Sequence, residues 1–173
     1  MVDVTDHCAE CGFTYDIHRA LAAADAVRTC VAEVSAILRN KDIDVRSRPR
    51  PDVWSPLEYG CHLRDVLLVQ RERVLLARRK DGASCTPMGR EERVEHDGYN
   101  KQDPAGVARQ LTDAAALFGN VLDRLATDDW DRTVVYNYPE THERSLRWLA
   151  IHTVHDVQHH LVDIRRQVWS GEC

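Results

Sequence analysis

Apolar residues recur at helical spacing in four long segments, which cover residues 16–38, 56–79, 104–125 and 145–169. In the first segment, Val27, Val31 and Val34 repeat as the buried face of a helix requires. No stretch shows sustained strand alternation, although TVVYNYP at 133–139 indicates a short extended piece before the last helix. The pattern therefore predicts an all-α protein.

Two of these helices have strong start signals. In SPLE, Ser55 is placed to cap the second helix, Pro56 occupies its first position, and Glu58 completes a capping box. Asp103 and Pro104 form a similar start for the third helix. We therefore expect the second and third helices to begin at these prolines.

The connection between the second and third helices, residues 81–102, is long. A connection of this length can return the chain along the bundle, so these two helices are expected to run parallel, although long loops also serve function. We predict one domain over residues 1–173, a four-helix bundle in up-down-down-up order. Residues 1–15 form an N-terminal arm and residues 16–169 form the bundle.

Charge and hydropathy exclude several classes of protein. The 173 residues include 23 basic and 28 acidic side chains, for a net charge of −5, which argues against a nucleic-acid partner. No apolar run is long enough to span a membrane. The N-terminal MVDVTDHCAECG is acidic where a signal peptide is basic. We expect a cytoplasmic protein without a membrane partner, in which disulfides are improbable.

Histidines concentrate in HTVHDVQHHL at residues 152–161, within the last helix. His155 and His159 are four residues apart and share one face, with His152 one turn earlier on the same stripe. His160 points about a third of a turn away. The stripe lies nearly opposite the apolar arc of the helix. It therefore either is solvated or lines a cavity at a second packing surface.

A metal site in a bundle needs a ligand from a facing helix, and His62 is the histidine that the second helix offers. Its alternative role is that of a satisfied core residue. Three imidazoles with an open position suit zinc, nickel or ferrous iron. Asp65, Asp156 and Asp163 lie within four residues of these histidines and are candidates to orient the rings, or ordinary partners of nearby arginines.

The start of the second helix, with His62, and the histidine cluster of the last helix together resemble motifs of the DinB-like (YfiT-like) metalloprotein superfamily. The residues in which the resemblance lies are Trp54, Ser55, Glu58, His62 and Asp65 in the second helix and His155, His159 and His160 in the last. The resemblance implies an up-down-down-up four-helix bundle. It also implies a divalent metal, zinc before nickel or iron, held by His62, His155 and His159.

Characterised members of this superfamily often use a low-molecular-weight thiol, as mycothiol-dependent maleylpyruvate isomerase and the mycothiol or bacillithiol S-transferases do. The resemblance therefore implies an enzyme in which a metal activates a thiol cofactor against a small-molecule electrophile. Trp54, Tyr59 and Tyr99 are the candidate substrate-binding residues. The alternative is a non-catalytic metal-binding stress or regulatory protein on the same scaffold, and either class allows a homodimer.

The N-terminal CAECG departs from the plain pattern of that superfamily. Cys8, Cys11 and Gly12 form half of a zinc knuckle, which lacks a second CxxC. One alternative is a second, structural zinc site to which His160 contributes. Others are a single mixed site with the histidines of the last helix, a redox pair, or two unbound thiols.

Overall fold

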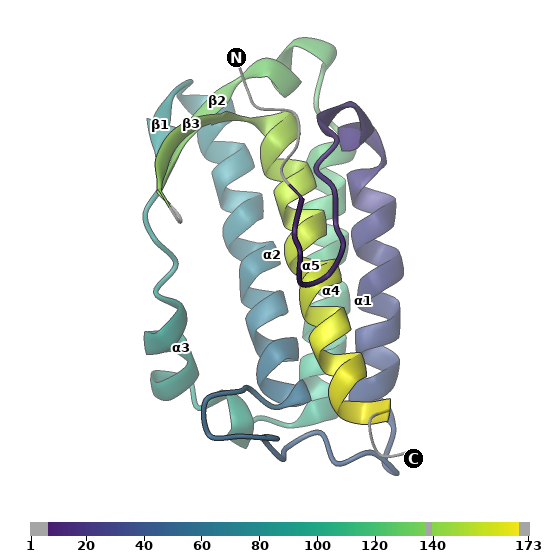
Figure 1. Cartoon of the computed structure of the whole chain (residues 1–173). Helices are drawn as coiled ribbons and strands as arrows, with labels where there is room; N and C mark the ends of the chain where they lie inside the picture. The colour runs from purple at the N-terminus through teal and green to yellow at the C-terminus, as the bar shows by residue number, and fades with distance from the viewer. Residues whose placement is uncertain (1–6, 138–139, 170–173) are drawn as a thin grey trace.

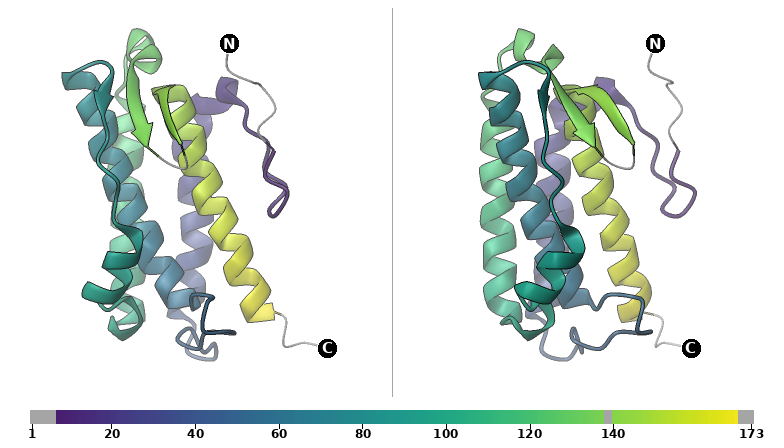
Figure 2. Two further views of the ribbon diagram at one scale, coloured as in Figure 1. Left: turned by 60° about the vertical axis from the view of Figure 1, so that its left-hand side comes forward. Right: turned by 90° about the vertical axis from the view of Figure 1, so that its left-hand side faces the viewer.

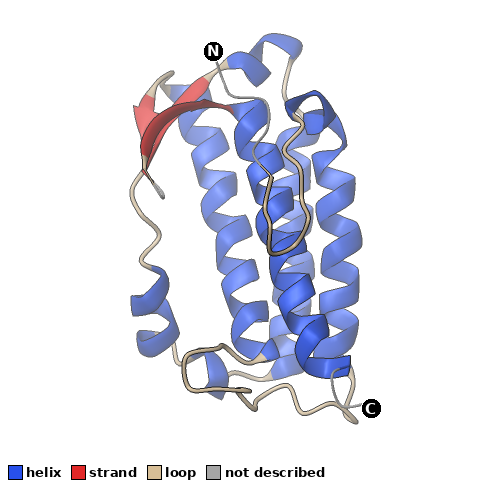
Figure 3. Cartoon of the chain, viewed as in Figure 1, coloured by secondary structure: helices blue, strands red, loops and turns tan. Residues whose placement is uncertain are grey.

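Four long helices lie side by side in the computed structural model, which describes residues 7–137 and 140–169 (Figures 1 and 3). They are α1 (Ala23–Arg39), α2 (Pro56–Arg79), α4 (Pro104–Asp123) and α5 (Leu146–Trp169). The shorter helical elements are α3 (Arg90–His96) and three 3₁₀ helices, η1 (Ile17–Ala22), η2 (Tyr99–Lys101) and η3 (Thr127–Asp131).

The starts of α2 and α4 are those that the sequence predicts. Ser55 Oγ accepts a hydrogen bond from the backbone N–H of Glu58, and the Glu58 carboxylate accepts one from the backbone N–H of Ser55 at 2.8 Å. The Asp103 carboxylate accepts from the backbone N–H of Gly106 at 2.7 Å. These caps satisfy backbone donors that the first helical turn leaves without partners.

The first long helix begins later than its apolar pattern predicts. Asp16 does act as a cap, since its side chain accepts from the backbone N–H of His18 at 3.0 Å. The turn that follows is the 3₁₀ helix η1, and the α-helix starts only at Ala23. A tight 3₁₀ segment is common at the beginning of an α-helix, and apolar spacing does not distinguish it from a first α-helical turn.

The helices enclose one apolar core. Helix α4 packs against α1 and α2, and α5 packs against the same two helices. Figures 1 and 2 show α2 and α4 running in one direction and α1 and α5 in the other. Fully buried core side chains come from all four helices, namely Val27, Val34, Leu57, Leu67, Leu111, Phe118, Leu149 and Ile164.

A three-stranded sheet covers the end of the bundle where α2 ends and α5 begins (Figures 1 and 3). Its strands are β1 (Ala83–Ser84), β2 (Thr133–Asn137) and β3 (Thr141–Ser145). Strand β2 is central, parallel to β1 and antiparallel to β3. The extended piece expected at 133–139 is thus a strand over 133–137, and residues 138 and 139 lie outside the described part of the chain. The all-α expectation overlooked this sheet, because β1 has two residues and β3 has no apolar alternation.

Two further segments lie on the outside of the bundle. The connection that follows β1 runs down the outer side of α2 and includes α3 (Figure 2). The N-terminal arm, residues 7–15, lies in front of α5 (Figure 1). The Arg166 guanidinium of α5 donates to the backbone carbonyl of Glu10 in this arm at 2.7 Å. Among the described residues, no helix is long and apolar enough to cross a membrane.

Candidate metal centre

The histidine stripe of α5 faces the N-terminal arm. Residues 152, 155 and 159 lie along one side of the helix because three or four residues make one turn. Phe13 of the arm packs on His155, with 5.2 Å between ring centroids, and Tyr15 lies at the same distance from His155. The stripe is therefore a second packing surface of α5, opposite the side that joins the bundle core.

This contact places the two cysteines of the arm next to two histidines of the helix. The metal-ligating atoms of Cys8, Cys11, His155 and His159 all lie within 4.8 Å of one another. The Cys8 sulfur and His159 Nδ1 are 3.5 Å apart. Two thiols and two imidazoles, each partly buried, thus meet at one point between the arm and α5.

The arm forms a tight turn around the cysteines. The backbone N–H of Gly12 donates to the carbonyl of Cys8 at 2.8 Å, and Gly12 adopts a positive φ of 73°, which favours glycine. Burial acts to raise the pKa of the Cys8 thiol, but the backbone N–H groups of Cys11 and Glu10 outweigh it and lower that pKa. Burial, with Cys8 nearby, raises the pKa of Cys11. The turn therefore favours a thiolate at Cys8.

Tyr15 connects two of the α5 histidines. Its hydroxyl oxygen lies 2.8 Å from Nδ1 of both His152 and His155. A single hydroxyl proton can serve one of these nitrogens, so the other ring must donate to the oxygen. Among the described residues, His155 Nε2 is buried and has no hydrogen-bond partner. Burial also lowers the pKa of His155 to about 4, so its ring is neutral, as a metal ligand must be.

A separate pair of imidazoles lies between α2 and α5. The rings of His62 and His160 are 5.1 Å apart, centroid to centroid. His62 is 5% exposed, and its Nδ1 has no hydrogen-bond partner in the described part of the chain. Burial, together with the charge of His160, lowers the pKa of His62 to about 3. A buried, neutral imidazole with an unused nitrogen is chemically suited to bind a metal.

Aromatic rings surround this second pair. Trp54 lies 5.1 Å from His62, and Tyr59 lies 5.0 Å from His160, both between ring centroids. Burial raises the pKa of the Tyr59 hydroxyl to about 12, so it remains a neutral donor. Two of the three predicted substrate-binding residues are thus beside His62 and His160.

The structure divides the predicted histidine trio between these two clusters. His62 of α2 contacts His160, whereas His155 and His159 face the cysteines of the arm. The helical phase of α5 explains this division. His160 lies about 60° around the helix from the buried Val157, while the other two point away from the core. The set expected for a second metal site is also divided, because Cys8 and Cys11 lie beside His155 and His159, whereas His160 lies beside His62. The donor atoms near the arm are those of Cys8, Cys11, His155 and His159, a set that includes neither His62 nor His160.

Asp65 pairs with arginines rather than with His62, which is the second of the two roles that the sequence left open. Its carboxylate accepts hydrogen bonds from Arg64 at 2.8 Å, from Arg93 at 3.2 Å and from the Tyr99 hydroxyl at 2.7 Å. Burial opposes ionisation, but these donors still lower the pKa of Asp65. Tyr99, a predicted substrate-binding residue, is fully buried as part of this network. These contacts give both residues a role in the core.

The other two predicted carboxylates lie near the histidines of α5. Asp163 Oδ2 is 3.1 Å from His160 Nδ1 and 3.7 Å from His159 Nε2. Asp156 is 3.8 Å from His152 Nε2 and 3.9 Å from His155 Nδ1, beyond hydrogen-bond distance. Asp163 is therefore the carboxylate that can hold a ring in place.

Sequence reasoning missed the role of Tyr15. The residue stands in FTYD, directly after CAECG, and this position was an available signal that it belongs to the same turn. Its contacts with α5 join residues that are 137 and 140 positions apart in the chain. No local pattern predicts such long-range contacts.

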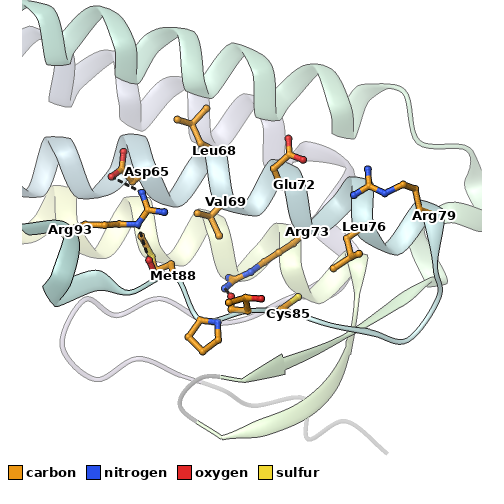
Figure 4. Close-up of a pocket in the computed structure, with 12 residues that line it drawn as sticks. Asp65, Leu68, Val69, Glu72, Arg73, Leu76, Arg79, Cys85, Met88 and Arg93 are labelled. Atoms are coloured by element: carbon orange, nitrogen blue, oxygen red, sulfur yellow. Dashed lines mark hydrogen bonds and ion pairs between the residues drawn. The ribbon is translucent and has the colours of Figure 1, made fainter. Parts of the chain in front are cut away.

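A surface cavity of about 470 Å³ lies between the outer side of α2 and the connection that follows β1 (Figure 4). Arg73, Arg93 and Asp65 contribute to its wall, and Arg93 donates to the carbonyl of Met88 at 2.7 Å. The residues that line this cavity do not include His62 or His160. The cavity is thus a feature of the outer face, distinct from both histidine clusters.

Comparison with known proteins identifies the scaffold. No curated protein matches the chain. A solved structure of YfiT from Bacillus subtilis aligns with a TM-score of 0.68 and 15% sequence identity, over 87% of this chain and 86% of YfiT. YfiT is described as a probable metal-dependent hydrolase with an unusual four-helix bundle topology. At this identity the likeness concerns the fold. The model of the DinB superfamily matches residues 36–164, most of the described bundle, and the chain belongs to that superfamily.

Proposed function

We propose that the protein is a divalent-metal-dependent enzyme that acts on a small electrophile with the help of a low-molecular-weight thiol. It either transfers the thiol to the electrophile, as an S-transferase does, or isomerises the electrophile. The reactive metal is held between α2 and α5 by His62 and His160, with Asp163 as the adjacent carboxylate. The observation on which this proposal depends is the facing imidazole pair, in which the buried Nδ1 of His62 has no partner among the described residues. This donor set revises the sequence-based choice of His155 and His159.

The donor chemistry fits a reactive centre. His62 and His160 would supply two imidazole ligands and leave coordination positions open for a thiol or a substrate, as catalytic metal sites do. A divalent metal bound there lowers the pKa of a coordinated thiol, which gives a thiolate at neutral pH. The YfiT comparison supports metal dependence, and it makes water the rival nucleophile to a thiol.

The protein side chains supply position and enclosure. Asp163 accepts from His160 Nδ1 and so fixes which ring nitrogen is left for the metal. Trp54 and Tyr59 pack on the two imidazoles with apolar ring surface, which limits the access of water. The Tyr59 hydroxyl stays protonated at neutral pH and can donate to an oxygen or halogen of that substrate.

The test is a conjugation assay with metal-loaded full-length protein. Protein loaded with zinc, nickel or ferrous iron is incubated with an electrophile such as monochlorobimane and one thiol, namely mycothiol, bacillithiol or glutathione. The adducts are then identified by mass spectrometry. We expect metal-dependent adduct formation with one of these thiols. His62→Ala should abolish it, whereas His18→Ala, which alters an exposed histidine, should not.

Two results would contradict the proposal. Equal rates for His62→Ala and the unaltered protein would remove His62 from the reactive centre. Stable metal binding without turnover of any thiol would favour the non-catalytic alternative. Turnover by hydrolysis alone would make water, rather than a thiol, the nucleophile.

A further inference from the structure

We propose that Cys8, Cys11, His155 and His159 form a second, closed zinc site that fastens the N-terminal arm to α5. This site is independent of the reaction proposed for His62 and His160. The four residues supply the thiolate and imidazole donors of a structural zinc site, in the spacing Cys-x₂-Cys and His-x₃-His.

The distances fit a tetrahedral ion. Zinc with Zn–S bonds of about 2.3 Å and Zn–N bonds of about 2.05 Å separates a sulfur ligand and a nitrogen ligand by about 3.5 Å. The Cys8 sulfur and His159 Nδ1 are 3.5 Å apart. All four ligand atoms lie within 4.8 Å of one another. A tetrahedral ion would draw the more widely spaced pairs within this limit to about 3.3–3.8 Å of one another.

The turn of the arm has the form of a zinc knuckle. Residues 8–13 close on themselves, because the backbone N–H of Cys8 donates to the carbonyl of Phe13 at 2.8 Å and that of Gly12 donates to the carbonyl of Cys8 at 2.8 Å. The backbone N–H groups of Cys11 and Glu10 act to lower the pKa of the Cys8 thiol, and that of Phe13 acts against the burial that raises the pKa of Cys11. Backbone donors of this kind stabilise thiolates that bind a metal.

Each of the two imidazoles has a polar group near one of its nitrogens. Tyr15 lies 2.8 Å from His155 Nδ1, which leaves the buried Nε2 of that ring without a partner among the described residues. His159 Nε2 lies 3.4 Å from a Glu10 carboxylate oxygen and 3.7 Å from one of Asp163. The Tyr15 contact can fix the tautomer and orientation of the His155 ring, whereas the two carboxylates only lie near His159.

A site with four protein ligands is closed to substrate, and its effect is structural. The arm is short, and its own turn is too small to bury a core. Zinc that joins Cys8 and Cys11 to α5 supplies binding free energy that holds Phe13 and Tyr15 against the helix. A redox dithiol would require neither the two imidazoles nor the tyrosine that orients one of them.

The test measures metal content and ligand type in the full-length protein. X-ray absorption at the zinc edge should show a component with two sulfur and two nitrogen ligands at about one equivalent per chain. Cobalt substitution should give thiolate-to-metal charge transfer and the intense visible bands of a tetrahedral ion. Both measurements use the unaltered chain, so they do not depend on a variant that folds.

Variants then assign the ligands. Cys11→Ser and His159→Ala should lose the sulfur-bound zinc, whereas His62→Ala should retain it even if all thiol chemistry disappears. Removal of zinc by a chelator should accelerate chymotryptic cleavage after Phe13 or Tyr15. Zinc with only nitrogen and oxygen ligands, a Cys8–Cys11 disulfide in metal-free protein, or undiminished sulfur-bound zinc in Cys11→Ser would overturn the proposal.

Discussion

Asp163 Oδ2 lies 3.1 Å from His160 Nδ1, within hydrogen-bond distance. The same oxygen is 3.7 Å from Nε2 of His159, which precedes His160 in the sequence and faces the N-terminal arm. One carboxylate therefore stands between the imidazole pair of α2 and α5 and the cluster that contains Cys8. Burial acts to raise the pKa of Asp163, but His160 lowers it on balance, so the group is ionised at neutral pH.

Substitution Asp163→Asn should weaken metal binding at the His62 and His160 pair. The amide keeps the shape of the side chain but loses the charge that fixes the His160 ring, and loss of such a partner costs roughly 10–100-fold in metal affinity. Competition with a chromophoric chelator measures this change.

Asp156→Asn is the matched control for this prediction. Asp156 is on the same helix, but it lies 3.8 Å or more from the nearest histidine nitrogens. We expect a change of less than about threefold, because no hydrogen bond to a ring is lost. Equal losses in the two variants would show that overall negative charge, rather than the contact with His160, determines affinity.

Replacement of Tyr15 by Phe should weaken zinc binding in the cysteine cluster. The hydroxyl lies between His152 Nδ1 and His155 Nδ1, and its loss leaves His155 without the contact that orients its ring. We expect zinc affinity to fall by roughly 10–100-fold. Phe13→Leu removes a ring that packs on the same histidine but no polar contact, so it should change the affinity less. The reverse order of the two variants would argue against hydrogen-bond orientation of His155.

Glu58→Gln tests the cap of α2 and its pH dependence. Glu58 accepts from the Ser55 backbone and from Arg48 at 2.8 Å. Burial acts to raise its pKa, but Arg48 and Ser55 lower it below the ordinary value of 4.5. A carboxyl group with a lowered pKa stabilises the fold above its unfolded-state pKa, and this contribution is lost as pH falls through the folded-state pKa.

We therefore expect Glu58→Gln to lower the free energy of unfolding by about 1–2 kcal/mol at pH 7. The difference from the unaltered protein should shrink as the pH falls below about 4.5. Urea unfolding of metal-free protein, followed by circular dichroism over this pH range, measures both effects. A difference that stays constant with pH would mean that the charge of Glu58 is not what stabilises the cap.

Local chemistry explains why much of the helical frame was predictable. Pro56 and Pro104 follow side chains that cap a helix, and both helices begin at those prolines in the structure. Such signals act within four residues, so neighbouring residues determine them. The strand β1 contains no comparable signal. It exists because its two residues pair with β2, which follows much later in the chain.

The candidate site was predictable only in part, for a similar reason. The spacing of His155 and His159 shows that they share a face, but it does not show what covers that face. Helical phase alone could have separated the three histidines of the last helix. His155 and His159 point away from the apolar arc, and therefore away from α2, whereas His160 lies closer to that arc. The approach of Cys8 to His159 joins residues 151 positions apart. Only the folded chain shows this contact.

The network around Asp65 provides a test that separates stability from metal binding. The carboxylate is 5% exposed and pairs with Arg64, which is 12% exposed, as well as with Arg93. Asp65→Asn leaves these cations without their charge partner in a buried position. We expect the free energy of unfolding to fall by about 3 kcal/mol. Tyr99→Phe removes one hydrogen bond to the same carboxylate and should cost about 1–2 kcal/mol.

Metal affinity at the His62 and His160 pair should change little in either variant, because Asp65 does not hydrogen-bond the His62 ring in the structure. Urea unfolding and chelator competition on the same samples give both quantities. If Asp65→Asn weakened metal binding as strongly as Asp163→Asn while Tyr99→Phe did not, Asp65 would act on His62 directly. Its bonds to the two arginines would then be secondary to that role.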